Sequence, residues 1–271
     1  MTFRYFFTLC LLWSTAALLQ GCGGGADAKN TLTGDAGVTI TPVAVQTGIY
    51  ASSINGQEFW GVITPSNRWY GLHSPSNGYD IYSGNITYVD AFRASVPTLK
   101  YQNNSAKYLA GSGSLSSTGQ GKLSGTLVLT ADVSIQPVNF INASATHSFT
   151  SNATKPLNDI AGTWTGQLSY GLGVTSQMAI TIDGNSGMIT VPDSFSGCHF
   201  NPSTSMASQI SNANVFTLTL NTSVTGSSTG CDNKLNNKTF TGVAFVAPST
   251  GSLIGVAADA EGYAIAFKAT R

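Results

Sequence analysis

Charge is scarce in this chain of 271 residues, of which only 9% are Asp, Glu, Lys or Arg. Twelve basic residues balance twelve acidic ones, so the formal net charge is zero. Proteins that bind nucleic acid concentrate Lys and Arg on one face, where these residues neutralise phosphates. A chain with few charges and no basic excess is therefore not expected to bind nucleic acid.

The sequence also lacks the spacings that mark metal and catalytic sites. Its three histidines, His73, His147 and His199, form no H-x-H or H-x-x-x-H pair. The segment from Asp183 begins like a calcium loop, but its twelfth position is Ser194 instead of Glu. The acidic residues nominate no general acid and base pair. We therefore expect no metal, no cofactor and no enzymatic activity.

One hydrolase-like motif is present. Residues 226–230 fit G-x-S-x-G, which is typical of the nucleophile turn of hydrolases. That fold places its catalytic His after the Ser, whereas all three histidines of this chain precede residue 226. We interpret the segment as a Gly/Ser loop that leads to Cys231.

Helical periodicity is missing, and the 30 glycines suit strands joined by tight turns. Residues 59–72 predict a hairpin around a Pro-containing turn, and the D-G pair at 183–184 predicts another. A polar stretch separates two strand-rich halves, 47–150 and 157–271. We predict an all-β protein with two antiparallel β-barrel or β-sandwich domains.

A long apolar run occurs at the start of the chain. Arg4 precedes a hydrophobic segment that is too short to span a bilayer, as in a secretory signal. Residues 19–22 then read L-Q-G-C, which resembles the lipobox of bacterial lipoproteins. The resemblance implies that residues 1–21 are a signal peptide cleaved after Gly21. It also implies that Cys22 is acylated and anchors the protein in the membrane.

The residue after the lipobox Cys indicates which bacterial membrane the lipoprotein is anchored to. Gly23 stands where enterobacterial lipoproteins retained in the inner membrane carry Asp, so the resemblance implies the outer membrane, on either face. Residues 22–46 are rich in Gly, Ala, Thr and Asp and predict a flexible tether. The alternative is an ordinary signal peptide that leaves Cys22 as a free thiol.

Cysteine is rare, with four residues in the chain. Cys10 lies in the signal peptide and Cys22 in the lipobox, which leaves Cys198 and Cys231 as an even pair in an oxidising compartment. We predict a disulfide between them that stabilises the second domain by about 3–4 kcal/mol. A metal or redox pair is the alternative, but C-x-x-C spacing is lacking.

The two halves begin alike, with G-I-Y at 48–50 and G-T-W at 162–164, which suggests a duplication. G-x-W followed by a basic residue on the last strand, Lys268 or Arg271, is similar to the lipocalin or calycin pattern. That resemblance implies that Trp164 closes a barrel floor beneath the cation. The second half also resembles small barrels of Gram-negative surface lipoproteins related to transferrin-binding proteins. The alternative is an ordinary core Trp.

Aromatic residues are concentrated in the first half, where 50–108 holds seven of the ten tyrosines. Tyr and Trp suit binding interfaces because they join a large apolar face to a polar tip. Cross-strand pairing for stability is the alternative. Adjacent residues of a strand face opposite ways, so one of Trp69 and Tyr70 should be core and the other exposed. The candidate binding surface comprises Trp60, Trp69, Tyr70, Tyr79 and Tyr82.

Together these features predict a lipid-anchored outer-membrane lipoprotein that acts as a non-enzymatic binding module. Its expected partner is a protein or a glycan. The alternative is a lipocalin-like carrier of a small apolar ligand inside a barrel. A carrier needs open space between inward apolar side chains, whereas a binding module needs its aromatic side chains on the outside.

Overall fold

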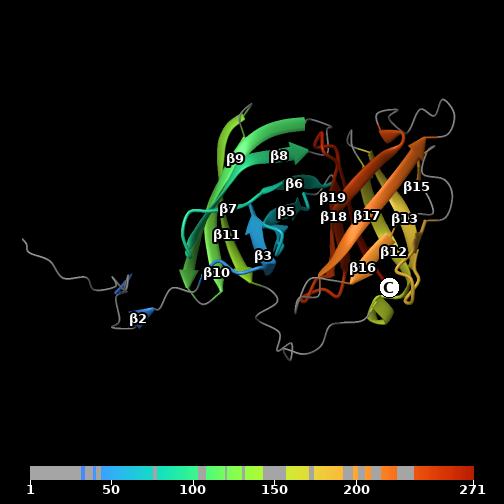
Figure 1. Ribbon diagram of the computed structural model, residues 1–271, viewed down its shortest axis with the longest axis horizontal. Helices are drawn as coiled ribbons and strands as arrows, with labels where there is room; N and C mark the ends of the chain where they lie inside the picture. The colour runs from blue at the N-terminus through green and yellow to red at the C-terminus, as the bar shows by residue number, and fades with distance from the viewer. Residues whose placement is uncertain are drawn as a thin grey trace, which may run out of the picture.

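The computed structural model describes residues 32–33, 39–40, 44–75, 78–102, 108–119, 121–129, 132–142, 157–170, 174–191, 198–200, 205–208, 215–224 and 235–271. These residues form two barrel-like antiparallel sheets that lie side by side (Figure 1). The prediction of an all-β protein with two barrel-like domains is confirmed. Among these residues, no helix has the length and apolar character needed to cross a membrane.

The first sheet is an up-and-down barrel in which every strand except β6 and β7 pairs with its neighbours in sequence, and β6 and β7 both pair with β8. Its order is β6-β5-β4-β3-β11-β10-β9-β8-β7, and a further pairing of β6 with β8 closes the ring. Closure removes the free edges that would otherwise pair with other chains. The strands are β3 (Gly48–Ile54), β4 (Gln57–Ile63), β5 (Arg68–His73), β6 (Asp80–Asn85), β7 (Thr87–Tyr88), β8 (Arg93–Gln102), β9 (Tyr108–Gly119), β10 (Lys122–Leu129) and β11 (Asp132–Asn142).

The second sheet repeats the up-and-down order. It runs β14-β13-β12-β20-β19-β18-β17-β15, with β16 also paired to β17, so that its first and last long strands are neighbours. The short 3-10 turn η1 (Leu157–Asp159) precedes it. The strands are β12 (Gly162–Tyr170), β13 (Val174–Ile182), β14 (Ile189–Thr190), β15 (Cys198–Phe200), β16 (Ser205–Ser208), β17 (Val215–Val224), β18 (Lys238–Val246), β19 (Leu253–Ala258) and β20 (Ala264–Thr270).

The hairpins predicted at 59–72 and at 183–184 are present as β4 with β5 and as β13 with β14, and a further hairpin, which was not predicted, joins β3 to β4. Asn55 and Gly56 join β3 to β4 with φ of 51° and 78°, the left-handed conformation that a two-residue hairpin loop demands. After β13, the Asp183 carboxylate accepts hydrogen bonds from the Asn185 and Ser186 amides at 3.1 and 2.7 Å. These bonds hold the pKa of Asp183 below its ordinary value. The carboxylate therefore serves the turn.

In the segment predicted to be a tether, the structure describes a short pair, β1 (Leu32–Thr33) with β2 (Thr39–Ile40).

The first strand of each barrel carries an aromatic side chain that makes the same kind of hydrogen bond. Tyr50 Oη donates a hydrogen bond to the Gln46 carbonyl at 2.6 Å, and Trp164 Nε1 donates one to the Ile160 carbonyl at 2.8 Å. In each barrel a buried aromatic ring thus ties its polar tip to the backbone four residues upstream. This shared geometry supports the duplication suggested by the two G-x-aromatic sequences.

The cation over the second barrel's Trp is Arg271. Its guanidinium lies 4.4 Å from the Trp164 ring centroid and donates hydrogen bonds to the Asp159 and Ala161 carbonyls at 3.2 and 2.5 Å. Lys268, the other candidate, forms an ion pair with Glu58 of the first barrel. A cation over the buried Trp ring is what the calycin resemblance implies, and here a cation–π contact joins the end of the chain to the second barrel.

Inward-facing side chains among the described residues pack into an apolar cluster inside each barrel. In the first barrel the Phe59 ring lies 6.3, 5.5 and 5.2 Å from the rings of Trp69, Tyr82 and Phe140. In the second, Trp164 belongs to a cluster of buried apolar residues drawn from β12, β13, β14 and β17–β20. A barrel of about eight strands is just wide enough for side chains to fill it.

Another apolar core lies between the barrels. Outward-facing residues of β3–β6 pack against outward-facing residues of β17–β20, and the rings of Trp60 and Phe245 meet at 5.8 Å. Strands at this contact are buried on both faces. The first barrel supplies Ile49, Trp60, Val62, Tyr70, Leu72, Tyr79 and Ile81, and the second supplies Val215, Val243, Phe245, Ala247, Ile254, Val256, Ala258, Ala264 and Ala266.

Polar contacts surround this interdomain core. The Gln102 side chain donates to the Ala264 carbonyl at 3.2 Å and accepts from the Ala264 amide at 2.8 Å. Glu58 and Lys268 form the ion pair already described. An apolar centre with a polar rim is the usual anatomy of a specific protein interface. The two barrels therefore hold one another in a defined orientation.

We expect Trp60→Ala to weaken both barrels. It removes a ring that contacts Phe245 of the second barrel, and losses of this kind cost about 3–5 kcal/mol of unfolding free energy. Hydrogen exchange measured by mass spectrometry should show faster exchange in β18 and β19. Phe59→Ala is the matched control, because Phe59 is the adjacent residue and faces the interior of the first barrel. Unchanged exchange in β18 and β19 of the Trp60 variant would contradict the interdomain core.

Candidate functional site

All five aromatic side chains of the candidate binding surface are buried. Trp60, Trp69, Tyr70, Tyr79 and Tyr82 are only 2–5% exposed. Trp69 and Tyr82 lie inside the first barrel, and the other three lie in the interdomain core. The prediction of an exposed aromatic surface is therefore wrong, because these rings are packed within the protein.

Trp69 and Tyr70 do face opposite ways, as strand alternation requires. The further expectation that one of them is exposed is wrong, because the second barrel covers the outer face that Tyr70 occupies. The sequence contains a signal that these strands are buried on both faces. Residues 59–63 and 253–258 are almost continuously apolar, whereas a strand with one wet face alternates apolar and polar residues.

The other predicted site residues lie outside the described residues. Gly21, Cys22 and Cys231 belong to this group, as does the side chain of Cys198. Lipid attachment, signal cleavage and the disulfide therefore stay predictions.

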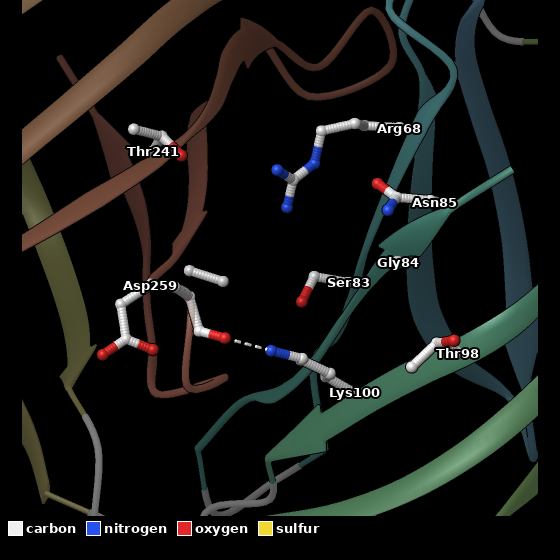
Figure 2. A pocket seen from close by; sticks show the side chains of 10 residues that line it. Arg68, Ser83, Gly84, Asn85, Thr98, Lys100, Thr241 and Asp259 are labelled. Atoms are coloured by element: carbon white, nitrogen blue, oxygen red, sulfur yellow. Dashed lines mark hydrogen bonds between the residues drawn. The ribbon is translucent and has the colours of Figure 1, made fainter.

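A polar cavity of about 370 Å³ lies between the two barrels (Figure 2). It is lined by residues of both barrels, so it exists only when they are joined. The first barrel contributes Arg68, Ser83, Gly84, Asn85, Thr98 and Lys100, and the second contributes Thr241, Ala258, Asp259 and Ala260. None of these residues was singled out from the sequence. Outward-facing Arg68 and Ser83 share a strand face with residues of the apolar core, which is a pattern that could have marked them.

The turn before β5 positions Arg68. Thr64 donates its amide to the Arg68 carbonyl at 2.9 Å, and the Arg68 amide donates to Thr64 Oγ1 at 3.0 Å. Between them Asn67 adopts a φ of 57°, which Asn tolerates better than most residues. The guanidinium then lies 5.4 Å from the Tyr70 ring centroid and projects into the cavity (Figure 2).

Lys100 supplies the second cation, from β8. Its ammonium group donates a hydrogen bond across the cavity wall to the Ala260 carbonyl (Figure 2). The contact joins β8 to the turn that connects β19 and β20. Lys100 therefore has both a structural partner and a place in the lining of the cavity.

The one acidic residue of the lining is turned away from Arg68 (Figure 2). Asp259 Oδ1 accepts hydrogen bonds from the Gly262 and Tyr263 amides at 2.6 and 2.8 Å. Asp259 Oδ2 lies 3.7 Å from the ammonium of Lys238, which also pairs with Glu261 at 2.8 Å. Lys238 is thus shared between Asp259 and Glu261, and Asp259 Oδ2 is buried without a hydrogen-bond partner in the described structure. Two cations, Arg68 and Lys100, and one carboxylate line the cavity, so the formal charge of its lining is positive.

A second polar pair lies elsewhere, on the inner face of the first barrel. His73 Nδ1 and Asp80 Oδ2 are 3.0 Å apart, while His73 Nε2 is buried without a hydrogen-bond partner in the described structure. The Phe59 ring stacks on His73 at 6.3 Å. This pair does not line the interdomain cavity. The described residues contain no group of three His, Cys, Asp or Glu side chains arranged to hold a metal ion.

Comparison with family models, with curated proteins and with solved structures found no match to this chain. A barrel fold alone supports many functions, so only the geometry of a site can distinguish among them.

The buried tyrosines of the interdomain core should ionise at a higher pH than a free tyrosine. Burial, reinforced by the nearby charge of Glu58, raises the pKa of Tyr79 to about 12, and burial also raises the pKa of Tyr70. An unfolded tyrosine ionises near pH 10, so stability should be intact below that pH and fall as the pH rises towards 12. Urea unfolding at a series of pH values measures this loss. Tyr79→Phe should show a smaller loss, and equal losses in both proteins would contradict the assignment.

Proposed function

We propose that this chain is a non-enzymatic binding protein that holds a small polar ligand in the cavity between its two barrels. The observation that carries the proposal is the cavity itself, which both barrels build and two cations line. Its volume of about 370 Å³ falls within the range of small-molecule sites. Binding sites are also commonly found at domain interfaces.

The proposed site differs from both sites considered from the sequence. The aromatic side chains are packed within the protein, so they offer no docking surface. A carrier of an apolar ligand needs open space inside a barrel, and the described side chains around Phe59 and around Trp164 pack against one another inside the two barrels. The interdomain cavity is lined largely by polar groups, which favour a polar ligand.

Binding is proposed rather than catalysis because of the groups that line the cavity. Guanidinium, ammonium, hydroxyl and amide groups face it, and these are groups that orient a ligand by hydrogen bonds. The Asp259 carboxylate is engaged by backbone amides and by Lys238. The His73–Asp80 pair lies on the inner face of the first barrel.

We further propose that the binding module is anchored to the bacterial outer membrane through acylated Cys22. The support is the L-Q-G-C sequence at 19–22 behind a short apolar segment. Two or more acyl chains on one residue would anchor the protein stably, since each buried methylene adds about 0.8 kcal/mol.

A cavity-filling substitution tests the binding site. A library of small polar compounds is screened for those that raise the melting temperature of the full chain. We expect Ser83→Phe, which places a ring in the cavity, to abolish stabilisation by those compounds. Ser112→Phe, on the exposed face of β9, is the matched control and should respond like the wild type. Compounds that stabilise both variants equally would refute the cavity as the site, and so would the absence of any stabilising compound.

Metabolic labelling tests the anchor. Cells that express the chain are grown with an alkyne fatty acid, and the incorporated label is detected on the purified protein. Cys22→Ser should lose the label completely because the acylated thiol is gone. Cys10→Ser, within the signal peptide, should keep it. Label retained by Cys22→Ser would refute the lipobox interpretation.

A further inference from the structure

We propose that the guanidinium of Arg68 is an oxyanion-binding group, so that the ligand of the interdomain cavity carries a carboxylate or a phosphate. This inference rests on the proposed binding function and specifies the chemical class of its ligand. It is carried by the unmet hydrogen-bonding capacity of Arg68, by the charge of the cavity and by the polar groups around it.

Arg68 differs from the other arginines of the described structure in its partners. Arg93 donates from both Nε and Nη2 to the Asp90 carboxylate at 2.7 Å, and Arg271 donates to two backbone carbonyls. Arg68 Nε, by contrast, is buried and has no hydrogen-bond partner among the described residues. A buried N–H group without an acceptor is unfavourable, so an acceptor supplied by a ligand would stabilise this arrangement.

The guanidinium is held in place before any ligand arrives. Its strand begins at a turn closed by two hydrogen bonds with Thr64, and its charged plane lies near the Tyr70 ring. The Tyr70 hydroxyl in turn donates a hydrogen bond to the Thr241 carbonyl of the second barrel at 3.4 Å. A guanidinium positioned in this way presents a planar fork of donors, which matches the two oxygens of a carboxylate or a phosphate.

The electrostatics of the cavity favour an anion. Arg68 and Lys100 outnumber the single carboxylate of the lining, and that carboxylate, Asp259, is turned away from Arg68. Lys100 donates one of its three ammonium N–H groups to the Ala260 carbonyl, which leaves two for a ligand. Charges act more strongly here than in open water, because the cavity borders the apolar interdomain core.

Neutral groups complete the proposed subsite. Ser83 and Asn85 are two residues apart on β6 and therefore share its outer face, from which the Ser83 hydroxyl points into the cavity (Figure 2). Thr98 and Thr241 add hydroxyl groups on opposite walls. These groups can hydrogen-bond to the polar body of a ligand whose anionic end lies at Arg68.

Arginine side-chain NMR reads this site directly. The full chain, labelled with ¹⁵N-arginine, is titrated in detergent with sodium phosphate, and in a separate arm with sodium acetate, at constant ionic strength. The Nε–H signal of Arg68 is assigned from its loss in Arg68→Lys. We expect a saturable shift of the Arg68 signal, while the Arg93 signal, already paired with Asp90, stays in place. The arm that saturates at the lower concentration identifies phosphate or carboxylate as the preferred group.

Calorimetry of the same titration adds matched variants. Arg68→Lys keeps the charge but loses the fork, and it should weaken the preferred anion about tenfold or more. Arg93→Lys is the control and should bind like the wild type. Circular dichroism confirms the fold of each variant, and the wild-type NMR titration requires no variant other than the one used for assignment.

Failure of this inference can be told apart from failure of the proposed function. No saturable shift of the Arg68 signal with either anion overturns the oxyanion site. If neutral compounds then stabilise the wild type and Ser112→Phe but not Ser83→Phe, the binding function stands with a neutral ligand. If no compound distinguishes these proteins, both proposals fail.

Discussion

The apolar core between the barrels is the contact on which the rest of this structure depends. It covers the outer faces of β3–β6 and β17–β20, so that strands such as β4 and β19 are buried on both sides. Large rings of the first barrel meet the Val, Ile and Ala side chains of the second, and Trp60 also meets the ring of Phe245. Without this contact a wide apolar surface would face water on each barrel, and the cavity would lose one of its walls.

The cavity takes its character from its place at the margin of that core. Along β5 the outward positions are occupied by Arg68, Tyr70 and Leu72, so the alternation that buries the last two residues brings a guanidinium to the edge. The Tyr70 ring belongs to the apolar core and also lies beside the Arg68 charge. A cation held at the boundary between an apolar core and a polar cavity is preorganised, which suits recognition of an oxyanion.

Local features could be predicted where short-range chemistry decides them. The D-G turn at 183–184 follows from the side-chain bonds of Asp183, and G-x-W with a terminal basic residue anticipated the ring and cation at Trp164 and Arg271. The aromatic cluster could not be interpreted correctly in the same way. Alternation shows that Trp69 and Tyr70 face opposite sides, but it does not show what covers each side.

The sequence by itself determined the strands, their turns and which side chains share a face, because these depend on residues close together in the chain. Only the tertiary structure decided which faces meet, since the partners of that contact, such as Trp60 and Phe245, are far apart in sequence. It also decided the cavity, whose walls come from strands of different barrels. Long-range packing thus buries the aromatic residues that were expected on the surface, and it places Arg68 in the lining of the cavity.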